Sequence, residues 1–202
     1  MELSVWNSPQ AKGFDRVRRR CARVKSHHTL LSYEITVKDN FERFSMYSIS
    51  IDYPNDSRVE FNSKGRREVG DVAFHLPEKV RIFLSWGELE KVSKRFNSVQ
   101  EHAEFSLNSM KKGKNVRNFE QVFTDSVAVN THKGTLNKVK FEEMIPGLPF
   151  AGKKVLQREA YSLHVHCDES KRYFVLYTMA PSDAQGKYDK TMTAMVDSFK
   201  CH

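Results

Sequence analysis

The chain has 202 residues, and its 33 Lys and Arg against 25 Asp and Glu give a formal charge of +8. Hydrophobic residues make up 39% of the sequence, enough for a core, so composition excludes a wholly disordered protein. No stretch approaches the roughly 20 apolar residues of a transmembrane helix, and no apolar run of the signal-peptide kind follows the basic N-terminus. We therefore expect a cytoplasmic protein without a membrane span.

The positive charge is concentrated in residues 1–28, where seven Lys and Arg against two Asp and Glu contribute +5. Phe14, Val17, Cys21 and Val24 recur at helical spacing, which predicts a basic helical segment with one apolar stripe. Its basic side chains are a candidate surface for phosphates or an acidic partner, with a solvated helix face or an organellar presequence as alternatives. These residues are Arg16, Arg18, Arg19, Arg20, Arg23 and Lys25.

Residues 29–202 are predicted to form a single domain that begins with strands. Apolar and polar residues alternate with a period of two, the pattern of half-buried strands, at residues 31–37, 47–51, 59–61, 72–74 and 80–86. The period then changes to that of a helix at residues 89–96. A second helix is expected after Ser98, because Ser98 and Glu101 form a capping box.

The second half of the chain predicts more strands and a closing helix. Short strands are expected at residues 119–123 and 127–129, and a hairpin at 161–167 and 172–178. Residues 133–154, rich in Lys, Gly and Pro, are predicted to be a long loop or insertion. Apolar residues between Tyr188 and Phe199 follow a helical period. Because strands do not alternate with helices, the prediction is an α+β fold with a mainly antiparallel β-sheet flanked by helices.

Several short patterns carry a resemblance to a known family. They are an aromatic strand from Tyr47 that runs into Tyr53-Pro54, the segment from Asp71 to Phe74, the predicted hairpin, and the segment from Met195 to Phe199. Over roughly residues 45–200 the chain resembles the PsbP-like family, which includes extrinsic photosystem proteins and a Ran-binding protein. The resemblance implies an antiparallel sheet between helices, as an α/β/α sandwich. It also implies a binding or assembly role without a catalytic set.

Cys167 and Cys201 are predicted to be neighbours. Cys167 closes one strand of the hairpin, and the closing helix must run back beside the other strand, which brings Cys201 to the hairpin turn. Three outcomes remain open: a reduced pair, a disulfide, or a metal site completed by His202, His166 or the terminal carboxylate. Thiolate and imidazole are ligands that zinc prefers, so zinc is the candidate cofactor if there is one.

His164 and His166 fall on the strand face opposite to Cys167. They are expected on the solvent side of the sheet, although two such histidines could also bind a metal or flank a phosphate. The sequence contains no P-loop, GxGxxG, HExxH or CxxC motif, which argues against nucleotide hydrolysis, dinucleotide chemistry and the common metalloproteases.

The leading hypothesis is therefore a non-enzymatic binding or assembly protein that contacts an acidic protein partner. Nucleic-acid binding through the basic N-terminal segment is the first alternative, and a metal-binding protein built on Cys167, Cys201 and His202 is the second. An enzyme built around the histidines and Cys167 ranks below these.

Overall fold

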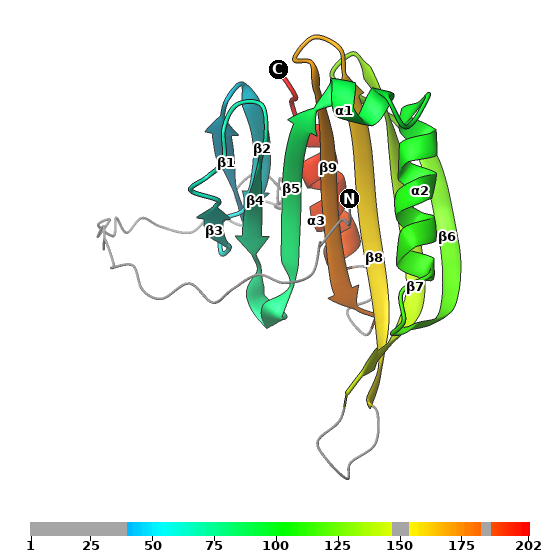
Figure 1. Ribbon diagram of the computed structural model, residues 1–202. Helices are drawn as coiled ribbons and strands as arrows, with labels where there is room; N and C mark the ends of the chain where they lie inside the picture. The colour runs from blue at the N-terminus through cyan, green and yellow to red at the C-terminus, as the bar shows by residue number, and fades with distance from the viewer. Residues whose placement is uncertain (1–39, 147–153, 183–186) are drawn as a thin grey trace, which may run out of the picture. The chain divides into compact units, whose positions relative to one another are not determined.

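The computed structural model describes residues 40–146, 154–182 and 187–202 (Figure 1). The chain divides into two compact units, Met1–Ile35 and Thr36–His202, and every described residue belongs to the second. The predicted basic segment 1–28 and the predicted strand 31–37 lie outside the described residues.

The second unit begins with short strands and two helices and continues with long strands. Its first half contains β1 (Phe41–Met46), β2 (Ile49–Pro54), β3 (Arg58–Phe61), β4 (Gly70–His75), β5 (Arg81–Glu88), α1 (Leu89–Ser93) and α2 (Val99–Lys111). Its second half contains β6 (Val116–Val129), β7 (His132–Ile145), β8 (Lys154–Cys167), β9 (Arg172–Pro181) and α3 (Lys187–Ser198).

The strands form a seven-stranded sheet in the order β3-β4-β5-β9-β8-β7-β6, in which all neighbours are antiparallel. β9, the last strand in sequence among the described residues, lies inside the sheet between β5 and β8. β1 and β2 form a separate two-stranded sheet. The predicted mainly antiparallel α+β architecture is confirmed.

The large sheet is covered on both faces. α2 packs on β7 and β8 at the front in Figure 1, with Leu107 against Val139, Phe141 and Ala160. α3 and β2 cover the opposite face and share the main core with it. The fully buried members of that core include Trp86, Phe74, Phe174, Ile49, Ile51 and Met195. The arrangement is a sandwich with the sheet between helical layers.

The Ser98 side-chain cap predicted for α2 is present, whereas Glu101 reaches back to the amide of Asn97, one residue before the predicted cap amide. The Oγ atom of Ser98 accepts a hydrogen bond from the amide of Glu101 at 3.1 Å, and Glu101 accepts one from the amide of Asn97 at 2.7 Å. These contacts satisfy amides at the start of the helix that have no partner within it.

The predicted loop at residues 133–154 is wrong. Residues 132–145 are strand β7, β8 begins at Lys154, and residues 147–153 lie outside the described residues. The lysines that suggested a loop are accommodated in the strand, because the Nζ atom of Lys138 lies 3.0 Å from Asp189 and 3.3 Å from Glu159. Lys138 of β7 thus forms ion pairs with both β8 and α3, and these compensate its charge within the sheet. Strand β1 is a further element that the alternation pattern did not predict.

None of the helices among the described residues is long and apolar enough to cross a membrane.

Candidate metal centre

Two cysteines and two histidines meet at one end of the large sheet. Cys167 is the last residue of β8, and His132 is the first residue of the neighbouring strand β7. Cys201 and His202 follow α3, and the backbone of Lys200 pairs with Ser50 of β2, which fixes the direction of this segment. The predicted proximity of Cys167 and Cys201 is confirmed.

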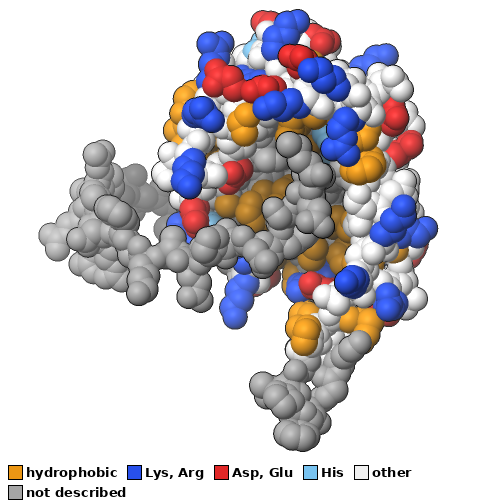
Figure 2. Space-filling view, in the orientation of Figure 1, with side chains coloured by type: hydrophobic (Ala, Val, Ile, Leu, Met, Phe, Trp, Pro, Cys, Tyr) orange, Lys and Arg blue, Asp and Glu red, His pale blue; other side chains and the backbone are white. Residues whose placement is uncertain are grey.

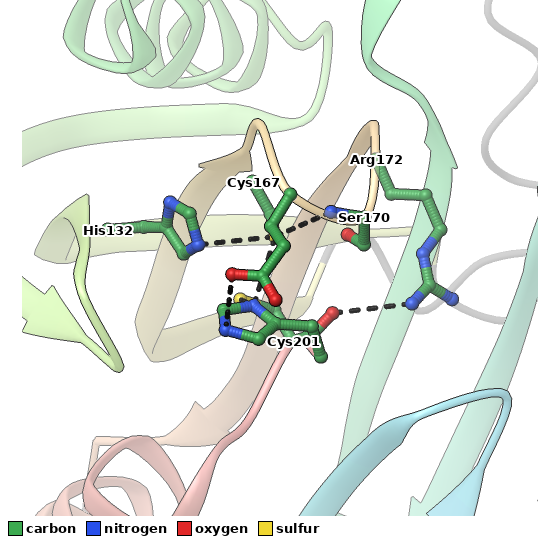
Figure 3. Close-up of polar contacts among 7 residues, drawn as sticks. His132, Cys167, Ser170, Arg172 and Cys201 are labelled. Carbon is green, nitrogen blue, oxygen red and sulfur yellow. Dashed lines mark hydrogen bonds and ion pairs between the residues drawn. The ribbon is translucent and has the colours of Figure 1, made fainter.

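The donor atoms of these four side chains lie within 4.8 Å of one another. Cys167 Sγ lies 3.4 Å from His132 Nε2 and 3.4 Å from His202 Nδ1, and Cys201 Sγ lies 3.5 Å from His202 Nδ1 (Figure 3). A tetrahedral zinc ion with bonds of about 2.3 Å to sulfur and about 2.0 Å to nitrogen holds its ligand atoms roughly 3.3–3.8 Å apart. The three distances therefore match the edges of a zinc tetrahedron.

The two thiols are free and completely buried. Burial, and then a hydrogen bond to Cys167 and the closeness of its sulfur, raise the pKa of the Cys201 thiol to about 12. Arg172 nearby opposes this shift only in part, so without a bound metal ion the thiol stays protonated at neutral pH. A bound metal ion reverses that preference by stabilising the thiolate, so binding releases protons.

Neighbouring groups orient two of the four side chains, those of Cys167 and His202. The amide of Ser170 donates to Cys167 Sγ at 3.3 Å, and His202 Nε2 lies 3.0 Å from a carboxylate oxygen of Glu169. A proton shared between Nε2 and Glu169 leaves the Nδ1 lone pair of His202 facing the sulfurs. Carboxylate-to-histidine contacts of this kind are the usual outer support of zinc ligands.

Arg172 connects this cluster to two distant loops. Its buried guanidinium donates to the carbonyl oxygens of Tyr47 at 3.0 Å, Arg67 at 3.1 Å and Cys201 at 3.3 Å. Burial, as the largest cause, lowers the pKa of Arg172, and the nearby Cys167 opposes that shift. Arg172 thus fastens the Cys201 backbone between the β1–β2 turn and the segment before β4.

A set of two thiolates and two imidazoles can supply all four positions of a tetrahedral ion. Sites of this type leave no position for substrate or water and stabilise structure, whereas catalytic zinc sites keep one position open. The arrangement is therefore suited to fixing the segment after α3 rather than to catalysis.

His166, predicted as a possible ligand of the same site, lies elsewhere. It is on the α2 face of the sheet, where its Nε2 lies 3.2 Å from Nδ1 of His102. His164 is only 1% exposed, and its Nε2 lies 3.1 Å from Ser106 Oγ. The expectation that His164 and His166 face solvent is wrong for His164, because α2 covers this face.

Burial controls the ionisation of these histidines. Burial, followed by the charges of His166 and Arg95, lowers the pKa of His102 to about 4. Burial, followed by His102 and His166, lowers the pKa of His164 to about 3. Burial also lowers the pKa of His166, against an opposing effect of Asp168. The cluster under α2 is thus made of neutral imidazoles at neutral pH.

Sequence reasoning missed His132 and Glu169. His132 follows the two-residue turn Asn130-Thr131, whose first residue has a φ of 53°, as hairpin turns often require. The turn would have predicted a hairpin if residues 132–145 had been interpreted as a strand and not as a loop. The basic residues from Arg16 to Lys25 lie outside the described residues.

The seven-stranded antiparallel sheet, with α2 on one face and α3 with β2 on the other, is the PsbP-like fold that the sequence resemblance implied. The cyanobacterial PsbP protein (CyanoP) of Synechocystis shares it with a TM-score of 0.58 and 12% identity, over 86% of this chain and 99% of that chain. The Ran-binding protein Mog1p of Saccharomyces cerevisiae has a TM-score of 0.52 and 13% identity, over 80% of this chain and 95% of that chain. No family model matches the sequence, and no curated protein matches it significantly.

Proposed function

We propose that the protein is a non-enzymatic binding protein in which a structural zinc ion fastens the segment after α3 to the β8–β9 turn. His132, Cys167, Cys201 and His202 are the proposed ligands. The fold is compatible with a non-enzymatic binding protein, since one protein that shares it is named for binding Ran. The observation that carries the metal proposal is the convergence of four donor atoms within 4.8 Å.

Both alternatives to the metal explain less of this geometry. A disulfide would use the two sulfurs but would give no role to the two imidazole nitrogens at 3.4–3.5 Å from them. A reduced pair would leave two buried thiols joined to histidines only by weak sulfur hydrogen bonds. A zinc ion uses all four donors and also accounts for Glu169 behind His202.

Native mass spectrometry of the protein after dialysis against equimolar zinc tests this proposal. The expected result is one zinc ion per chain, lost on denaturation, after which all three cysteines react with an alkylating agent. Cys201→Ser should abolish stoichiometric zinc, while Cys21→Ser, which changes the third cysteine, should retain it. A metal-free wild-type chain, or a chain lighter by the two hydrogen atoms lost in a disulfide and with only Cys21 reactive, would refute the metal site.

The partner of the basic segment is proposed to be an acidic protein, with nucleic acid as the rival. Both are supported only by the charge of residues 1–28, which is +5. Binding of a labelled poly-glutamate peptide and of an oligonucleotide should be compared as salt rises, because phosphate binding weakens steeply with salt. Neutralising Arg18, Arg19 and Arg20 should weaken the preferred probe, whereas neutralising three lysines, Lys111, Lys112 and Lys114, should not. Equal effects of both triple variants would argue against a specific role for the segment.

A further inference from the structure

Strand β6 forms one edge of the large sheet. It has 14 residues and pairs with β7 on one side, and among the described residues no strand pairs with its other side. In Figure 1 it lies at the outer edge beyond β7. Figure 2 shows this side of the molecule in the same orientation, with charged side chains scattered over it. A long edge strand of this kind presents backbone donors and acceptors to any strand that approaches it.

The two halves of β6 differ in regularity. The register with β7 shifts between Arg117 and Glu120 and again between Gln121 and Phe123, and Asn118 has a φ of 48°. Such bulges discourage strand addition. From Phe123 to Val129, in contrast, the pairing is continuous. This regular half carries one charged residue, Asp125.

The hairpin turn fixes which backbone groups point outward. In a two-residue hairpin, the residues that flank the turn form a hydrogen-bonded pair, so Val129 and His132 exchange both bonds. Alternation then directs the backbone groups of odd-numbered residues from 123 to 129 toward β7. The groups of Thr124, Ser126 and Ala128 point away from β7, and all three residues are exposed.

We propose that two copies of this chain associate by antiparallel pairing of residues 123–129 of β6 about a twofold axis at Ser126. The outward residues of one copy then meet outward residues of the other: Thr124 faces Ala128 of the second copy, and Ser126 faces its own counterpart. Three such hydrogen-bonded pairs supply about six backbone bonds and join the two sheets into one.

The sequence of this segment fits self-pairing. Asp125 lies opposite Val127 of the second copy, so its carboxylate does not face another carboxylate. Thr124, Ser126 and Ala128 are small, and the exposed Val122, at 42%, lies just before the paired segment, opposite the hairpin turn of the second copy in this register. The twofold axis pairs the β6 edge of each copy with the β6 edge of the other. No β6 edge is left free, so association through this strand stops at the dimer.

Sedimentation velocity from about 10 to about 500 µM measures the association, because strand pairing alone buries less surface than a permanent interface and so predicts a concentration-dependent dimer. Ser126→Pro removes the central outward amide without touching the β7 ladder and should weaken the dimer at least tenfold. Ser126→Ala keeps that amide and should leave the dimer intact. Far-UV circular dichroism shows whether each variant is folded.

A charge-pairing experiment tests the register itself and does not depend on proline. Ser126→Lys and Ser126→Glu place like charges against each other at the twofold axis, so each should be monomeric alone, and a mixture of the two should form a heterodimer. Ser109→Lys, an exposed change on α2, should dimerise like the wild type. A wild-type chain that is monomeric throughout, or variants that do not associate on mixing, would overturn the proposal.

Discussion

We expect the free energy of unfolding of this domain to decrease as the pH falls, because His164 is buried in its neutral form. Ser106 Oγ donates to the carbonyl oxygen of His102 at 3.1 Å, so it accepts the hydrogen bond from Nε2–H of His164 at 3.1 Å. The other ring nitrogen, Nδ1, is buried and has no hydrogen-bond partner among the residues that the structure describes. A proton on Nδ1 would therefore place a charge between the sheet and α2 with nothing to compensate it.

The sign and size follow from the pKa of His164 in the two states. In the unfolded chain it is about 6.5, and burial lowers it to about 3 in the folded domain. Between these values the unfolded state binds a proton that the folded state does not, so stability falls as the pH falls. From pH 7 to pH 4 the loss attributable to His164 is about 3 kcal/mol. His102, with a pKa lowered to about 4, acts in the same direction.

Urea unfolding of the wild type and of His164→Gln at pH 7 and pH 4 measures this loss. The glutamine keeps an N–H near the position of Nε2 but cannot take up a proton, so the variant should lose about 3 kcal/mol less than the wild type between the two pH values. NMR titration of the His164 ring should show no protonation above pH 4. Equal losses in the two proteins, or a ring that titrates near pH 6, would refute this account of the buried histidine.

Three further predictions concern the candidate metal centre and α2. A chelator should lower the melting temperature of the wild type by several degrees and leave that of Cys201→Ser unchanged, because a ligand that binds only the folded state stabilises it; equal effects on both would contradict the site. Arg172→Lys should lower the free energy of unfolding by about 2–4 kcal/mol, since a lysine cannot reach three carbonyl oxygens in different directions, and a loss below about 0.5 kcal/mol would show that these bonds matter little. Ser98→Ala should cost about 1 kcal/mol in urea unfolding through loss of the α2 cap, whereas Ser109→Ala on the same helix should change little; similar costs would argue against the cap.

The hairpin and the closing helix were predictable because their patterns are nearly free of interruption. The structure has β8 ending at Cys167, β9 beginning at Arg172, and α3 at Lys187–Ser198, close to the predicted limits. These elements also determine where the chain returns. The neighbourhood of Cys167 and Cys201 could therefore be predicted from order and length alone.

Strand β7 and the covered face of β8 could not be predicted in the same way. In the sequence, Lys138 and Lys140 are typical of a loop. In the fold, both form ion pairs with Glu159 of the neighbouring strand, which the sequence pattern does not reveal. Alternation assigns His164 to one face of a strand, but it does not say that α2 packs there. His132 lies 35 residues before Cys167, so only the pairing of β7 with β8 brings it to the cysteines.

The position of β9 has a consequence for how the chain folds as it is made. Strands β3 to β5 and strands β6 to β8 can each assemble locally, but they join only when β9 inserts between β5 and β8. Until residue 181 has left the ribosome, both of those strands present an unpaired edge and an incomplete apolar face. The pairing of β5 with β9 joins residues about half the domain apart in sequence, and such long-range contacts slow folding. Nascent chains that stall before β9 therefore expose two sheet fragments that are prone to aggregate, and this domain is most exposed to aggregation in the period before β9 is made.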